Sequence, residues 1–141
     1  MMLKLALILV LVGIVHSRPY YRDQIPNGYS VPNPCGSPPT WNPVGHYNPI
    51  YQTTLKNPFA NDFRNNAYDW PRICALDSDK DGRTNGEELG DPNCTWVFGT
   101  TPSGRATGHP GICEPVGSTR CVWQNFACDC LETCSGLVGY P

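Results

Sequence analysis

The hydrophobic positions of the chain are concentrated in one N-terminal run and scattered after it. The run covers residues 5–15, follows a single early cation, Lys4, and is succeeded by small residues up to Ser17. This order is typical of a signal peptide at residues 1–17, because the run is too short and too near the N-terminus for a transmembrane helix. A membrane anchor is the alternative. Since no later stretch is apolar enough for membrane insertion, we expect a soluble, secreted, extracellular chain.

Between residues 20 and 58, proline interrupts each hydrophobic stretch. Asn-Pro occurs four times in this segment. Each proline removes a backbone donor and favours an extended conformation in the residue before it, which excludes long helices. The segment is nevertheless too aromatic for a chain that gains nothing by folding. We expect short strands and turns that pack their aromatic side chains inward, among them Tyr29, Trp41, Tyr47 and Tyr51.

Short helices are predicted after this segment. Phe59 and Phe63 are four residues apart and would share one face of a helix from Pro58 to about Tyr68. Pro71 is suited to the first turn of a second helix. The later run TWVFGTTPSG predicts a strand ended by glycine and proline. With 15 prolines and 14 glycines, the expected fold class is a small disulfide-rich α+β domain, mostly irregular, with short helices and strands.

The cysteine content and the charge narrow the class of protein. All eight cysteines follow the apolar run, and an even number in an exported chain indicates disulfide bonds, here four. The small net charge of −2 gives no reason to expect nucleic acid as a partner. No serine lies in a nucleophile-elbow pattern, and we predict that the protein is not an enzyme. The cysteines are Cys35, Cys74, Cys94, Cys113, Cys121, Cys128, Cys130 and Cys134.

The most informative motif is an acidic loop at residues 77–88, which reads D-S-D-K-D-G-R-T-N-G-E-E. Aspartate at positions 1, 3 and 5, glycine at 6, asparagine at 9 and glutamate at 12 match the calcium loop of an EF-hand. Alternating aspartates in a tight turn direct their oxygens to one centre and repel one another without a cation. The alternative is an acidic, solvated turn. The predicted ligands are Asp77, Asp79, Asp81, Arg83 through its carbonyl, Asn85 and Glu88.

The loop departs from an ordinary EF-hand because prolines and glycine limit its flanking helices and no second loop exists. Asn85 is a good N-cap residue, and Glu88 three positions later gives the spacing of a capping box. A bond between Cys74 and Cys94 would hold the ends of the loop together and contribute about 3 kcal/mol. We expect a structural Ca²⁺ with a Kd on the order of 10⁻⁴ to 10⁻³ M, as in extracellular modules.

Several further motifs occur in a fixed order, namely IPNGYSVPNPCG, WNPVGH, NPFANDF, DSDKDGRTNGEELGDPNCTW and HPGIC. Between about Tyr20 and Cys113, their order and spacing resemble the temptins, water-borne protein pheromones of molluscs. The resemblance implies a secreted, non-enzymatic signal that acts by protein–protein contact with other pheromone peptides or a receptor. It also implies the Cys74–Cys94 bond and a bond from Cys35 to the C-terminal region, with Cys113 as the best candidate.

The expected organisation is a signal peptide (1–17), a temptin-like domain (18–113) that contains the calcium loop, and a cysteine-rich C-terminal extension (114–141). The four cysteines of the extension could form two local disulfides in any of three pairings. Alternatively, Cys121 could replace Cys113 as the partner of Cys35.

The remaining candidate sites carry weaker signals. His46 and His109 are too few to hold a transition metal without other ligands, and we expect them in turn or core hydrogen bonds. Thiolate metal binding by Cys128 and Cys130 is less favoured than disulfides in an oxidising compartment. Asn93 begins a glycosylation sequon. The rival function classes are a calcium-binding structural protein of an extracellular or shell matrix and a small protease inhibitor.

Overall fold

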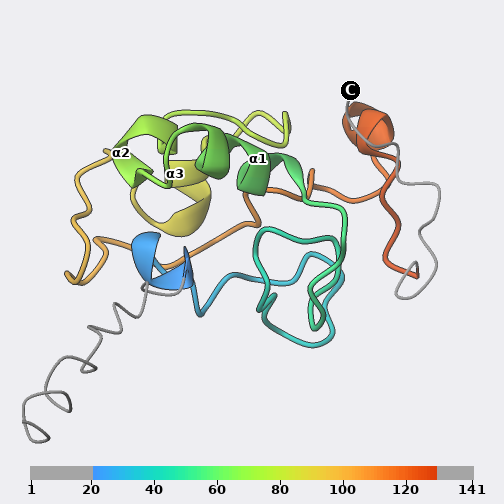
Figure 1. Cartoon of the computed structure of the whole chain (residues 1–141). Helices are drawn as coiled ribbons and strands as arrows, with labels where there is room; N and C mark the ends of the chain where they lie inside the picture. The colour runs from blue at the N-terminus through green and yellow to red at the C-terminus, as the bar shows by residue number, and fades with distance from the viewer. Residues whose placement is uncertain (1–20, 130–141) are drawn as a thin grey trace, which may run out of the picture.

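The computed structural model describes residues 21–129, which form turns and irregular loops joined by short helices (Figure 1). The predicted signal peptide, Cys130 and Cys134 lie outside the described residues. The helical elements are the 3-10 helix η1 (Tyr21–Gln24), α1 (Pro58–Asn65), α2 (Trp70–Ile73), α3 (Asn85–Leu89) and the 3-10 helix η2 (Thr119–Gln124). Helices α1, α2 and α3 gather together, and η2 lies apart from them in Figure 1. No helix within residues 21–129 is long and apolar enough to cross a bilayer.

The predicted strands were wrong, because the described chain contains only isolated bridges. Proline removes the donors that a ladder of hydrogen bonds would need. The run after Cys94 forms a turn instead, in which the N–H of Thr100 donates to the carbonyl of Val97 at 3.0 Å. Val97 and Phe98 are both exposed, so this run buries no apolar face. The fold is therefore a small disulfide-rich domain with short helices. The bridges pair Pro32 with Thr40 and His46 with Lys56.

Helix α1 confirms the first predicted helix. The side-chain oxygen of Asn57 accepts a hydrogen bond from the N–H of Ala60 at 3.1 Å, and Pro58 follows in the first turn, where no donor is needed. Phe59 and Phe63 are buried on one face, with ring centroids 5.9 Å apart. The helix ends at residue 65, earlier than predicted, because the backbone is left-handed at residues 67 and 68.

The hydrophobic core consists of two clusters. One cluster lies around the helices and contains, among others, Ile25, Val31, Val44, Phe59, Phe63, Trp70, Ile73 and Leu89. The second joins the proline-rich segment to the C-terminal segment and contains Trp41, Tyr47 and Ile112, with Phe126 packed against them. The predicted inward packing is thus confirmed for Trp41 and Tyr47. It was wrong for Tyr29 and Tyr51, which are exposed.

The disulfide pairing differs in part from the expected one. The predicted Cys74–Cys94 bond is present. The implied Cys35–Cys113 bond was wrong, and so was the alternative in which Cys121 bonds Cys35. The proposed local disulfides of the extension are also contradicted, since Cys121 and Cys128 bond cysteines outside it. The observed bonds beside Cys74–Cys94 are Cys35–Cys128 and Cys113–Cys121.

This pairing follows from the way in which the C-terminal segment packs. The ring of Phe126 contacts Trp41 edge-on at 6.0 Å between centroids, which brings the segment to the proline-rich loops that carry Cys35. The buried side chain of Gln124 accepts from the N–H of Cys113 at 2.9 Å. Residues 114–129 are therefore held to the temptin-like part of the chain by disulfides and by packing.

Candidate calcium site

The acidic loop is tightly turned by hydrogen bonds to its own carboxylates. Asp77 accepts from the N–H of Asp81 at 3.2 Å and from the N–H of Gly82 at 2.9 Å. Gly82 has a φ of 97°, a conformation that a residue with a Cβ rarely adopts. As a result, Asp77, Asp79 and Asp81 each place a carboxylate oxygen within 4.8 Å of the others. The structure thus brings together the first three predicted ligands.

The other predicted side-chain ligands leave buried oxygens without partners. Within the described residues, Asp79 Oδ2, Asn85 Oδ1 and both carboxylate oxygens of Glu88 are buried and have no hydrogen-bond donor. Such a group costs about 1–3 kcal/mol, and more if it is charged. These oxygens belong to loop positions 3, 9 and 12, which in an EF-hand face the ion. All of these predicted ligand atoms are oxygens, as a hard cation such as Ca²⁺ requires.

The electrostatics of the loop also favour a bound cation. Burial, followed by repulsion from Asp81 and Asp77, raises the pKa of Asp79. Burial also raises the pKa of Glu88, with further contributions from Asp79, Asp81 and Glu114. In the absence of a cation, the fold therefore favours protonated forms of these two acids. A divalent ion would remove that repulsion and hold both groups ionised.

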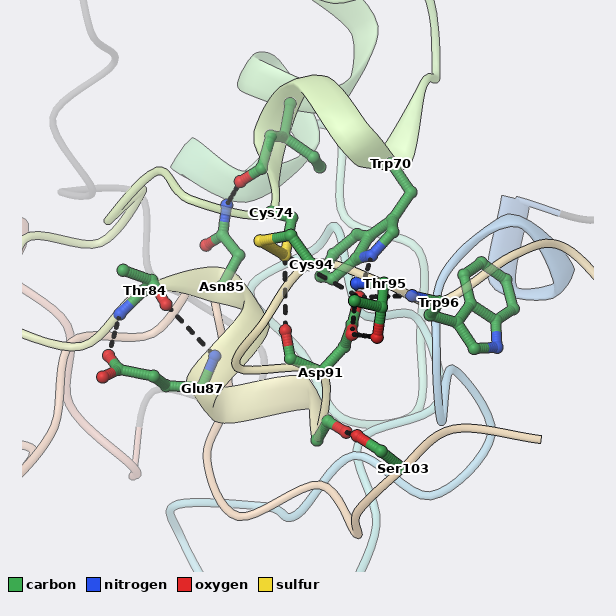
Figure 2. The surroundings of a disulfide bond; sticks show 12 residues. Trp70, Cys74, Thr84, Asn85, Glu87, Asp91, Cys94, Thr95, Trp96 and Ser103 are labelled. Carbon is green, nitrogen blue, oxygen red and sulfur yellow. Dashed lines mark hydrogen bonds between the residues drawn. A yellow bond between two sulfur atoms is a disulfide. The ribbon is translucent and has the colours of Figure 1, made fainter. Parts of the chain in front are cut away.

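Helix α3 begins at Asn85, the residue that was predicted to be its N-cap. Thr84, not Asn85, is the N-cap, and it exchanges hydrogen bonds with Glu87 in a capping box at 3.1 and 2.7 Å (Figure 2). The predicted pairing of Asn85 with Glu88 as a capping box was therefore wrong. The amide of Asn85 instead donates to the carbonyl of Ile73 at 2.8 Å (Figure 2). Because the capping box uses Glu87, the side chain of Glu88 takes no part in the cap.

The Cys74–Cys94 bond lies beside the buried carboxylate of Asp91, which sequence reasoning missed. Asp91 accepts hydrogen bonds from the indole N–H of Trp70 at 2.8 Å and from the backbone N–H of Thr95 at 2.9 Å (Figure 2). It thereby joins α2 to the turn that carries Cys94. The Asp-Pro-Asn sequence after Gly90 is a turn signal that could have suggested this role.

A downstream segment contacts the acidic loop. The guanidinium of Arg120 donates to the carbonyl of Asp81 at 2.6 Å, and the N–H of Glu114 donates to the Asp81 carboxylate at 3.3 Å. The N–H of Thr107 donates to the carbonyl of Glu88 at 2.7 Å. The ammonium of Lys80 lies 5.0 Å from the ring centroid of Trp123. Sequence reasoning missed these contacts, because no local pattern predicts them.

Arg83 and Glu114 add charge at the edge of the site. The guanidinium of Arg83 donates to Thr107, and the role predicted for the Arg83 carbonyl stays a prediction. Glu114 accepts from the N–H of His109 at 2.8 Å, and burial raises the pKa of its carboxyl. An acid from outside the loop therefore adds to the negative potential around Glu88.

The remaining candidate sites are separate features of the described chain. His46 contacts the carbonyl of Thr53 at 2.8 Å through Nδ1. His109 is buried and packs edge-on against Trp41 at 4.9 Å between centroids. Neither histidine belongs to the acidic cluster. Asn93 is exposed, and its glycosylation stays a prediction.

The fold and this loop define a class of small disulfide-stabilised domains built around an acidic turn with EF-hand spacing. The family model described as Temptin C-terminal matches residues 15–112. Temptin from Aplysia californica is 45% identical over 112 residues, which cover 77% of this chain and 88% of that protein. The chain belongs to the temptin family. No solved structure matches it.

Proposed function

We propose that the protein is a secreted, water-borne signal of the pheromone type that acts without catalysis, through contact with other pheromone peptides or with a receptor. The observation that carries this proposal is the 45% identity to temptin over 88% of that protein's length. The disulfides suit an extracellular protein, since such bonds persist in oxidising surroundings.

We further propose that the acidic loop binds one structural Ca²⁺. Asp77, Asp79, Asp81, Asn85 and Glu88 would hold it, together with the carbonyl of Arg83. Buried oxygens without donors at Asp79, Asn85 and Glu88 support this assignment. When bound, the ion supplies the positive charge that the acids need in order to stay ionised together. It would thereby fix α3 against the segment that runs from Thr107 to Arg120.

The signalling role is tested in a two-choice water-flow assay with animals of the source species. The folded protein, alone or combined with the other secreted peptides, is expected to attract them, and protein that has been reduced and alkylated is not. Absence of attraction in both settings would refute the signalling role. Adsorption to calcium carbonate without a behavioural response would instead support the matrix alternative, for which the same loop would bind mineral.

A further inference from the structure

A second candidate site lies away from the acidic loop. A cavity of about 360 Å³ is bordered by η1, α1 and the loops between residues 42 and 56. This volume falls within the range of about 300–1,000 Å³ that is usual for small-molecule sites. Its apolar lining includes Ile25, Val44, Phe59 and Phe63, which belong to the main core cluster. The cavity therefore lies against the outer face of this core cluster.

The charged residues that line this cavity all have one sign. Arg22, Lys56 and Arg64 border it, and no aspartate or glutamate does. Within residues 21–129, no carboxylate lies within salt-bridge distance of these three cations. The chain as a whole has a net charge of −2, so the concentration of cations here is local. A cationic edge above an apolar floor complements a ligand that has an apolar body and an anionic group.

Lys56 and Arg64 are exposed, so their charged groups can reach a ligand in the cavity. The ammonium of Lys56 lies 3.2 Å from Nε2 of His46, whose Nδ1 contacts the carbonyl of Thr53. The guanidinium of Arg22 lies 4.3 Å from the centroid of the Tyr29 ring. Ile50 extends the apolar lining to the surface, where it is 57% exposed.

We propose that this cavity binds a small amphipathic anion, with its apolar body against Ile50 and the stacked rings of Tyr21 and Tyr68 and its carboxylate or sulfonate beside Lys56 and Arg64. The ligand would be a small molecule, since the cavity has a bounded volume of small-molecule size. This site is independent of the calcium loop and of the signalling role, and either could fail without the other.

The probe is 1-anilinonaphthalene-8-sulfonate, an aromatic anion that fluoresces when its rings enter an apolar site. Titration of the whole disulfide-bonded protein in calcium should give saturable binding of one probe per chain. The neutral analogue N-phenyl-1-naphthylamine, which lacks the sulfonate, should bind at least about tenfold more weakly. Unchanged near-ultraviolet circular dichroism would establish that the probe reports on the folded state.

Matched variants separate the site from nonspecific adsorption. The double variant Lys56→Gln/Arg64→Gln should weaken binding about tenfold, whereas Arg72→Gln/Arg105→Gln, which has the same net charge and lies outside the cavity lining, should not. Ile50→Asp should abolish binding, and Val97→Asp, at a site that is 63% exposed, should leave it intact. The proposal is overturned by a lack of saturable binding up to about 1 mM probe, by equal losses in variants and controls, or by equal affinity for the neutral analogue.

Discussion

Glu88→Gln is the substitution that separates the cost of the buried acid from the benefit of the ion. Glu88 has no exposed surface, and both of its carboxylate oxygens lack donors within the described chain. Glutamine has nearly the same shape and no charge. The variant should therefore be more stable than the native protein in a chelator and less responsive to calcium.

The magnitudes follow from linkage. At pH 7 the fold must keep a proton on Glu88 or hold a buried charge, and proton uptake by an ordinary carboxyl at that pH costs about 3.5 kcal/mol. In a chelator the variant should thus gain up to about 3.5 kcal/mol in free energy of unfolding. With a Kd on the order of 10⁻⁴ M, about 10 mM calcium stabilises the native protein by about 2.7 kcal/mol, and a Kd of 10⁻³ M gives about 1.4 kcal/mol. The variant should gain almost nothing from calcium.

The assay is urea unfolding at pH 7 with the disulfides intact, in a chelator and in about 10 mM calcium. Glu87→Gln is the matched control, because Glu87 is the exposed neighbour and its capping box tolerates glutamine. That control should keep the full calcium effect. Equal calcium stabilisation of native protein and Glu88→Gln would refute the assignment of Glu88 as a ligand.

Three further predictions concern the supports of the site. Replacing Cys74 and Cys94 together by serine should lower the free energy of unfolding by about 3 kcal/mol and weaken calcium binding, as measured by urea unfolding and calorimetry; equal calcium affinity would make the bond irrelevant to the site. Gly86→Ala should cost about 1–3 kcal/mol, because its Cβ would lie 2.5 Å from the carbonyl oxygen of Asp91 and 2.6 Å from the sulfur of Cys74; a neutral effect on thermal unfolding would contradict the close packing. Burial lowers the pKa of His109 to about 3, so below pH 6.5 the unfolded chain binds a proton that the folded one does not, and this group should remove about 2 kcal/mol of stability between pH 6.5 and pH 5. His109→Gln should lose that part of the pH dependence, and an unchanged pH profile would show that His109 contributes none of it.

The local features of the fold were predictable from sequence because neighbouring residues determine them. The four-residue spacing of Phe59 and Phe63 and the cap before Pro58 suffice for α1. Likewise, the aspartate spacing and Gly82 turn the acidic loop without distant help. The Cys74–Cys94 bond closes only a short loop around this turn.

The features that sequence reasoning missed depend on contacts between distant segments. Cys35 bonds a cysteine 93 positions away, and this pairing follows from the packing of Phe126 on Trp41. No local pattern specifies that packing. The cap of α3 was misplaced by one residue, since threonine and asparagine are both good caps and the choice depends on a bond from Asn85 to the distant carbonyl of Ile73.

The predicted strands are absent from the described residues for a related reason. The extended conformation that proline favours and the aromatic content suggested strands, but a ladder needs two donor-bearing partners. The bridges at Pro32 and His46 do not extend into ladders, and nearby prolines supply no donors. Packing of Trp41 and Tyr47 against Ile112 replaces the sheet as the source of order in this segment.

The central claim is that the loop at residues 77–88 binds a single divalent cation. Calorimetric titration of calcium into chelator-treated protein at pH 7, in two buffers of different ionisation enthalpy, tests it most directly. We expect one site with a Kd on the order of 10⁻⁴ to 10⁻³ M and release of protons on binding, because the folded state raises the pKa of Asp79 and Glu88. No saturable heat up to about 10 mM calcium would contradict the claim.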